Sequence, residues 1–340
     1  MPGPRFRHRT RSGAGRRCRS RRRPVPAVAR DVPHPAAHGA PTPVSIPSPN
    51  RSLAARAEPW LLLLPSIVLF ATFTHIPIVR TAIDSFHSTP KGARPSRFVG
   101  LANYEDMAAD PIFWKALINN LVYAIGTIPL SIGLALAMAL FVNGRIAGRG
   151  LLRMAYFTPT VLPMIAVANI WLFFYTPHYG LLDQIAGLFG FGATNWLGSQ
   201  ATALPAIMVV TVWKEAGFFM IFYLAALQTI SPDLKEAAAI EGASDLTVFR
   251  RITWPLLMPV TLFILVNAVI NAFRMVDHIF ILTGGGPDNA TNVLLFHLYQ
   301  VGFKFWDQGY ATALTIVLLA ILSLMALVQF VAAGRRVHYQ

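Results

Sequence analysis

Six long stretches of apolar residues, separated by short polar segments, dominate the chain from residue 59 onward. A helix needs about 20 consecutive apolar residues to cross the hydrocarbon core of a bilayer, and each stretch is long enough. The pattern therefore predicts an all-α, polytopic membrane protein with six transmembrane helices. The six stretches are residues 59–79, 116–144, 154–182, about 202–227, about 252–281 and 308–334.

Prolines lie within the first four of these stretches. A proline removes one backbone hydrogen bond from a helix, and in a membrane the freed carbonyl must find another partner. We therefore expect these helices to be kinked and packed against neighbours. The prolines are Pro65, Pro77, Pro129, Pro159, Pro163 and Pro205.

Basic residues between the stretches predict which side of the membrane is cytoplasmic, because short cytoplasmic loops carry an excess of Lys and Arg. With six spans, both termini lie on one side. The loop containing Arg145, Arg149 and Arg153 falls on that side, as does the terminal pair Arg335 and Arg336. We therefore expect both termini in the cytoplasm.

The composition agrees with a membrane protein, since 54% of the residues are hydrophobic and only 13% are charged, against about 25% charged in soluble domains. The net charge of +14 comes mainly from residues 1–57, which hold 13 Arg and one acid, whereas residues 58–340 have a net charge of +2. Residues 1–57 are also rich in Pro and Ser, and this composition predicts a disordered tail before a transmembrane domain at 58–340.

The role of this basic tail remains open between two readings, a solvated cytoplasmic extension and a segment that contacts anionic membrane lipid. Proteins that bind single-stranded nucleic acid interleave basic residues with aromatic residues that stack on bases. No aromatic residue lies between Phe6 and Trp60. We therefore expect no nucleic-acid partner.

The sequence contains no motif for ATP hydrolysis or metal catalysis. A phosphate-binding loop reads G-x-x-x-x-G-K-[ST], and no Gly-Lys dipeptide occurs in the chain. The histidines are scattered without the H-E-x-x-H spacing of zinc hydrolases, and the single cysteine, Cys18, cannot form a disulfide within the chain. We predict a protein that is not an enzyme, with no catalytic residues, no metal and no cofactor of its own.

The segment between the fourth and fifth stretches, residues 228–259, carries seven charged residues and is predicted to be cytoplasmic. Ser231, Pro232 and Asp233 form a typical helix start, with a capping hydroxyl, a proline in the first position and an acid in the first turn. Gly242 can adopt the positive φ that ends such a helix. Ser244 and the following acid predict a second short helix, which we expect to end at Pro255.

Within this segment, Glu236-Ala237-Ala238, Gly242, Ile252 and Pro255 follow the spacing E-A-A-x3-G-x9-I-x-L-P, with Trp254 in place of the usual leucine. The segment resembles the EAA loop of ABC importer permeases. Residues 277–287 and 99–104 resemble the carbohydrate-type branch of that family. The similarity extends from about Trp60 to Arg336.

The resemblance implies the type I ABC importer permease fold and a location in the bacterial cell (inner) membrane. In that family the EAA loop sits in a groove of a separate, dimeric ATP-binding cassette subunit, which binds ATP and Mg. Glu236, Ala237 and Ala238 would pack in that groove, and Gly242 would set the angle between the two short helices. A second permease subunit and an extracytoplasmic solute-binding protein would complete the importer, and the substrate would be a carbohydrate.

Four polar residues of the fifth stretch fall within about 60° of arc on a helix with 100° per residue. They are Asn267, Asn271, Arg274 and His278. Two interpretations remain open for this stripe, a translocation path that binds sugar hydroxyls and a set of bonds to neighbouring helices. In the fourth stretch, Lys214 and Glu215 project about 100° apart, so we expect them to contact different partners. An aqueous cavity and a subunit interface both remain possible surroundings for them.

A different class of function is also compatible with the six stretches, namely a self-sufficient secondary transporter or channel. Such a protein is expected to carry an ion-coupling acid deep within a span. It has no need of a charged cytoplasmic segment that contacts a separate ATPase.

Overall fold

The computed structural model describes residues 53–334, except residues 91, 93, 145, 146, 191 and 275. Most of the predicted tail, residues 1–52, therefore lies outside the described residues. The described part is helical apart from loops and one isolated bridge between His87 and Phe98. It contains five helices that are long and apolar enough to cross a membrane, or six if one bent pair forms a single span. The predicted all-α, polytopic membrane fold is confirmed.

Five of the predicted stretches correspond to long helices. The first span consists of α1 (Leu53–Phe70), the wider π-helical turn η1 (Ala71–His75) and α2 (Ile76–Asp84). The others are α4 (Pro111–Asn143), α8 (Ala203–Thr229), α11 (Trp254–Arg274) and α14 (Gln308–Gly334). The bounds of α14 match the predicted stretch at both ends.

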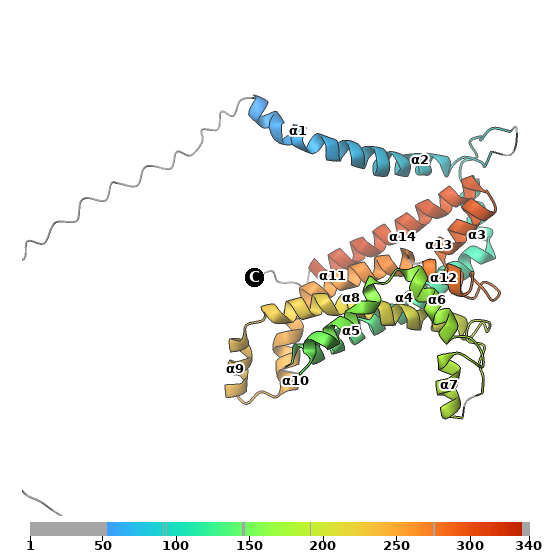
Figure 1. The fold of residues 1–340 in the computed structure, drawn as a ribbon. Coiled ribbons are helices and arrows are strands. Elements are labelled where there is room, and N and C mark those ends of the chain that lie inside the picture. The colour runs from blue at the N-terminus through green and yellow to red at the C-terminus, as the bar shows by residue number, and fades with distance from the viewer. Residues whose placement is uncertain are drawn as a thin grey trace, which may run out of the picture. The chain divides into compact units, whose positions relative to one another are not determined.

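Helix α8 lies at the centre of the helix packing. It runs along α4 and also packs against α11 and α5 (Arg149–Val161), as Figure 1 shows. In its most apolar stretch 61% of the residues are buried, compared with 11% in α14 and none in the first span. The exposed apolar side chains of those two spans are typical of helices that face lipid or another subunit. A polar group on the buried part of α8 must therefore find its partner inside this chain.

The third predicted stretch is not one straight span. Helix α5 is followed by α6 (Met164–Phe174) at an angle of 101°. Pro163 has no N–H to continue the helix, and the residue before a proline is pushed into extended backbone, as Leu162 is with ψ of 135°. A further short helix, α7 (Leu181–Leu188), then begins at the predicted end of the stretch. The third stretch is thus a bent pair of helices that can form one span, with the expected kink at Pro163.

The charged segment 228–259 begins with two short helices, α9 (Pro232–Ile240) and α10 (Asp245–Val248). Helix α10 does not end at Pro255 as predicted, because it passes through the π-helical turn η2 (Phe249–Thr253) directly into α11. In this wider turn the Trp254 N–H bonds to the Phe249 carbonyl, five residues back. A π turn re-aligns the carbonyls just where the proline ring would meet one, so the helix continues. The first span repeats this arrangement, with η1 directly before Ile76 and Pro77.

At the other end of the spans lie the shorter helices α3 (Ala102–Ala109), α12 (Asp277–Leu282) and α13 (Leu294–Tyr299), with the π-helical turn η3 (Gln300–Lys304). Asn103 fastens α3 to the end of the first span, since its side-chain amide donates to the carbonyls of Ser85 and His87 at 2.8 and 3.0 Å. The Tyr104 hydroxyl also lies 2.8 Å from Ser85 Oγ. The short motif at 99–104 thus holds α3 against the end of the first span.

Candidate functional site

The coupling segment, which we define as residues 228–259, is built by local hydrogen bonds. Ser231 caps α9, and its hydroxyl accepts from the Asp233 N–H at 3.2 Å. Pro232 occupies the first position, and Asp233 places a negative charge beside the free amides of the first turn. The predicted start of this helix is confirmed.

Gly242 ends α9 with φ of +74°, a backbone conformation that glycine adopts without strain. The Ala243 N–H donates to the Ala238 carbonyl at 2.9 Å, and the Gly242 N–H donates to the Ala239 carbonyl at 3.0 Å. These two bonds are those of a Schellman C-cap. Ser244 then caps α10 by accepting from the Thr247 N–H. The predicted turn at Gly242 is confirmed, while its role in setting the angle between the two helices stays a prediction.

The side chains of the coupling segment differ in exposure. Glu236 and Ala237 are exposed, whereas Ala238 is only 8% exposed and faces its own chain. Two apolar residues that the sequence analysis did not single out, Ile240 and Leu246, are 88% and 64% exposed. Ile240 follows Glu236 by four residues, so the two share one face of α9. In the sequence, the signal for this surface is an apolar residue four positions after the glutamate.

The remaining motif residues lie where the segment joins the fifth span. Ile252 is half-buried in η2, and Pro255 is exposed in the first turn of α11. Trp254 packs its ring against Phe249, with 6.2 Å between the ring centroids. The tryptophan that replaces the usual leucine therefore has an aromatic partner one helical turn away.

Lys214, near the middle of α8, binds the broken end of α5. Its Nζ donates to the carbonyls of Pro159, Thr160 and Leu162 at 3.0, 3.1 and 2.7 Å. Pro163 lacks the N–H that a continuous helix would offer to Pro159, so the ammonium replaces this donor and adds a positive charge where the helix dipole is negative. All three ammonium donors are used, so Lys214 is satisfied by partners within its own chain.

Helices α5 and α8 approach closely beside this lysine. The Thr160 hydroxyl donates to the Lys214 carbonyl at 3.3 Å. One turn further along α8, a Cβ added to Gly217 would lie 2.1 Å from the Tyr156 carbonyl oxygen, which is closer than atoms can approach. Glycine at position 217 is therefore required for this helix crossing.

Glu215, the neighbour of Lys214, contacts a different helix, as predicted. Its Oε2 accepts from the Asn271 side-chain amide of α11 at 3.1 Å. Both residues line a cavity of about 10 Å³, together with Thr127 and Ser131 of α4, and this is about the space that one water needs. Lys214, Glu215 and Asn271 with their partners are called the buried seam below.

The four residues of the predicted stripe do not form one surface. Asn267 donates to the Phe263 carbonyl of its own helix at 2.8 Å, and Arg274 is exposed at the last residue of α11. His278 lies on α12, after the non-helical Val276, and is fully buried. Its Nε2 is 3.0 Å from the Tyr123 hydroxyl and 3.3 Å from Thr211 Oγ1. A single helical wheel therefore does not describe His278, and the part of these residues in translocation stays a prediction.

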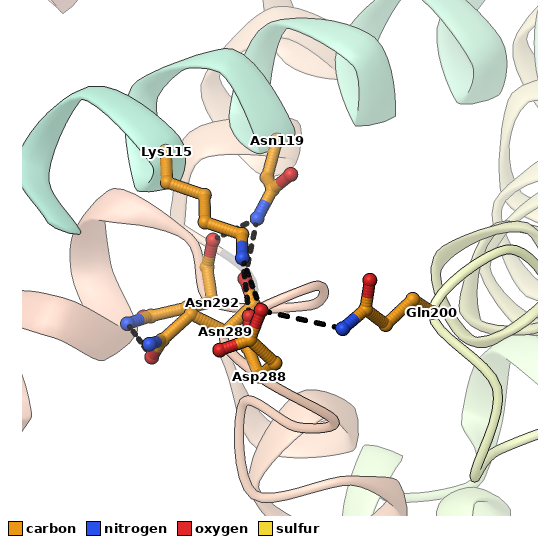
Figure 2. Close-up of polar contacts among 6 residues, drawn as sticks. All are labelled: Lys115, Asn119, Gln200, Asp288, Asn289 and Asn292. Atoms are coloured by element: carbon orange, nitrogen blue, oxygen red, sulfur yellow. Dashed lines mark hydrogen bonds and ion pairs between the residues drawn. The ribbon is translucent and has the colours of Figure 1, made fainter. Parts of the chain in front are cut away.

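A polar cluster joins three segments at the end of the bundle remote from the coupling segment (Figure 2). Lys115 of α4 forms an ion pair with Asp288 at 3.0 Å and also donates to the Asp288 carbonyl. Gln200 donates to the same carboxylate at 3.2 Å, and Asn119 donates to the carbonyls of Asn289 and Asn292. The loop after α12 is thereby tied to α4 and to the loop before α8. Gly284 and Gly285 begin this loop, and both have positive φ.

Residues 112–337 match the family described as binding-protein-dependent transport system inner membrane component. The chain belongs to this family of ABC importer permeases. The matched range includes four long spans, the bent pair and the whole coupling segment. The permease was expected to have no metal site, and in the part that the structure describes no group of three His, Cys, Asp or Glu residues is arranged to hold one. That expectation stays a prediction, as does the absence of a cofactor.

Named relatives cover most of the permease. It is 36% identical over 279 residues to the trehalose/maltose transport system permease protein MalF of Thermococcus litoralis, covering 81% of this chain and 93% of the relative. It is 32% identical over 297 residues to the sn-glycerol-3-phosphate transport system permease protein UgpA of Agrobacterium fabrum, covering 87% and 99%. These relatives are transport permease subunits.

The fold has a counterpart among solved structures. The permease aligns with a chain of a bacterial alginate ABC transporter, crystallised in complex with an alginate pentasaccharide-bound periplasmic protein. The TM-score is 0.75 at 22% identity, and the match covers 84% of this chain and 98% of the other. At this identity the likeness establishes the fold alone.

Proposed function

We propose that this chain is the transmembrane permease subunit of an ATP-driven, binding-protein-dependent importer for a carbohydrate. The substrate class, a mono- or oligosaccharide or a polyol such as glycerol phosphate, rests on relatives named for trehalose and maltose, arabinooligosaccharides and glycerol phosphate. The permease performs no chemistry itself. Hydrolysis of ATP, with its Mg, takes place on a separate dimeric ATP-binding cassette subunit.

One observation carries the coupling part of this proposal, namely the exposed surface of α9 formed by Glu236, Ala237 and Ile240. An 88% exposed isoleucine beside a glutamate, on two rigidly capped short helices, suits a groove on a partner protein. Movement of that partner would act on the spans through α8 before the segment and α11 after it. This connection provides the rigid-body lever that alternating access needs.

The proposed assembly contains two permease subunits, the ATPase dimer and an extracytoplasmic solute-binding protein. The permease subunits are embedded in membrane lipid. Arg149 and Arg153 at the start of α5 support a cytoplasmic location for that loop and for the coupling segment. We therefore place both termini in the cytoplasm of a bacterial cell with the permease in its inner membrane. Within the fifth span, Arg274 and Asn267, which bonds only to its own helix, remain the candidates for substrate contact, while Asn271 and His278 bond to other helices.

Uptake by proteoliposomes containing the assembled importer tests the proposal. Glu236→Ala and Gly242→Val should each abolish ATP-dependent uptake. Gly242→Asn is the matched control, because asparagine tolerates the positive φ that valine does not, and it should retain most uptake. Lys235→Ala controls for loss of a charge beside Glu236. Uptake that proceeds without ATP, or that survives both damaging changes, would favour the alternative of a self-sufficient secondary transporter or channel.

A further inference from the structure

Helix α7 stands apart from the packed spans, at the end of α8 opposite the coupling segment (Figure 1). Its residues Leu181, Ile185 and Leu188 are 45%, 44% and 85% exposed, and Tyr179 and Phe189 at its two ends are each 77% exposed. The three aliphatic residues are spaced i, i+4 and i+7, so they form one stripe along the helix. The family's coupling role does not account for this apolar surface.

The position of α7 is fixed against the last turn of α6. A Cβ added to Gly180 would lie 2.3 Å from the Phe174 carbonyl oxygen and 2.6 Å from that of Thr176. The Gly180 N–H also bonds to the Thr176 carbonyl at 2.8 Å. Only glycine permits this close approach. Helix α6, to which this turn fixes α7, also has an exposed apolar residue, Phe173, at 65%.

The segment around α7 is almost free of charge. Asp183 is the only Asp, Glu, Lys or Arg among residues 175–202. Its carboxylate accepts from the His178 N–H at 2.8 Å, the Trp196 indole N–H at 2.7 Å and the Thr194 N–H at 3.3 Å. The hydrogen bond from the His178 amide is the main reason that the pKa of Asp183 lies below its ordinary value. This carboxylate thus stabilises the segment from within, and the exposed apolar face of α7 carries no charged side chain.

We propose that α7 lies in the outer headgroup region of the bilayer, with Leu181, Ile185 and Leu188 in contact with lipid acyl chains. A helix that lies in this region buries its apolar face at the boundary of the acyl chains and keeps its polar groups away from them. The apolar stripe, the exposed Tyr and Phe at its ends and the buried carboxylate meet that requirement. Only the assignment to the outer leaflet rests on the proposed orientation of the permease.

Spin-label accessibility in the assembled importer, reconstituted in lipid nanodiscs, tests this surface. Because Cys18 is the only cysteine, Cys18→Ser gives a background in which Leu188→Cys carries a single nitroxide. Oxygen concentrates in the bilayer, whereas a nickel chelate stays in water. Ile240→Cys, measured in the permease reconstituted without its ATPase so that no partner covers α9, is the matched control, since this aliphatic residue is 88% exposed.

The ratio of oxygen to nickel accessibility should be several-fold higher at position 188 than at position 240. Phe189→Cys should behave like Leu188→Cys, which keeps the test decisive if one variant assembles poorly. Equal nickel accessibility at 188 and 240 would overturn the proposal. Protection of 188 from nickel only after the loaded solute-binding protein is added would also overturn it, because the surface would then belong to that protein. ATP-independent uptake would refute the proposed function without changing the result at 188.

Discussion

The coupling segment and the buried seam use charged residues in opposite ways. In the coupling segment, Glu236 is exposed, and the bonds that shape the segment join residues within five positions of one another. In the buried seam, Lys214 and Glu215 are each 9% exposed and bond to residues 52 to 56 positions away. The first region keeps its shape through local hydrogen bonds, and the second holds α5, α8 and α11 in a fixed relation.

Polar residues in a permease can therefore serve two different roles, either to stabilise the packing of its helices or to bind a partner protein. A buried charge without partners is strongly unfavourable, so the seam residues must be satisfied within the chain, and their removal should destabilise the fold. Exposed residues of the coupling segment add little to the stability of this chain. Their removal should instead weaken binding to a partner. Stability and ATP-coupled uptake should therefore respond to different residues.

Lys214→Met should give the largest loss of stability. It leaves the carbonyls of Pro159, Thr160 and Leu162 without the ammonium, at about 1 kcal/mol or more for each, or about 3 kcal/mol in total. Unfolding of the purified permease in detergent measures this loss. Lys214→Arg should retain part of the contact. Lys115→Met is the matched control at an exposed ion pair (Figure 2) and should cost about 1 kcal/mol or less. Equal losses for Lys214→Met and Lys115→Met would remove the distinction between the two regions.

Asn271→Leu should have an intermediate effect. It removes the amide that donates to Glu215, and side-chain hydrogen bonds between membrane helices contribute about 0.6 to 2 kcal/mol. Stability should fall by about that amount, and uptake should fall with it. Co-purification with the ATPase reports assembly. A variant that unfolds normally but no longer transports would show that Asn271 acts on substrate rather than on helix position.

Glu236→Ala and Ile240→Asp should have the smallest effect on stability and still abolish coupled uptake. Both side chains are exposed, so the free energy of unfolding should change by no more than about 0.5 kcal/mol. Unfolding and uptake measured on the same preparations test this pair of outcomes. Loss of stability comparable to that of Lys214→Met would show that the coupling segment belongs to the core of the fold.

Local features of this permease were predictable from its sequence. Apolar length located the long spans, because crossing a bilayer requires about 20 residues whatever their packing. Ser231 and Gly242 identified the ends of α9, because capping depends on residues a few positions apart. The spacing from Glu236 to Pro255 identified the family, which the match over residues 112–337 confirms.

Features that depend on distant contacts were not predictable. Pro163 signalled a break, but the 101° bend requires Lys214 of another helix to accommodate the free carbonyls. The end predicted at Pro255 was wrong because the preceding π turn lets the helix continue. The sequence analysis placed His278 on the polar stripe of the fifth stretch because a helical wheel assumes one continuous helix. The exposure of Ile240 could not be predicted, because the sequence does not show which side chains stay uncovered in the folded chain.

Cross-linking from Ile240 tests most directly whether the coupling segment serves a partner while the buried seam serves the fold. In the Cys18→Ser background, a photoreactive label on Ile240→Cys or Leu246→Cys of the assembled importer should yield an adduct with the ATP-binding cassette subunit. The same label on Leu188→Cys, at the other end of α8, should yield none. An adduct with the ATPase from position 188, or from none of the three positions, would contradict the account.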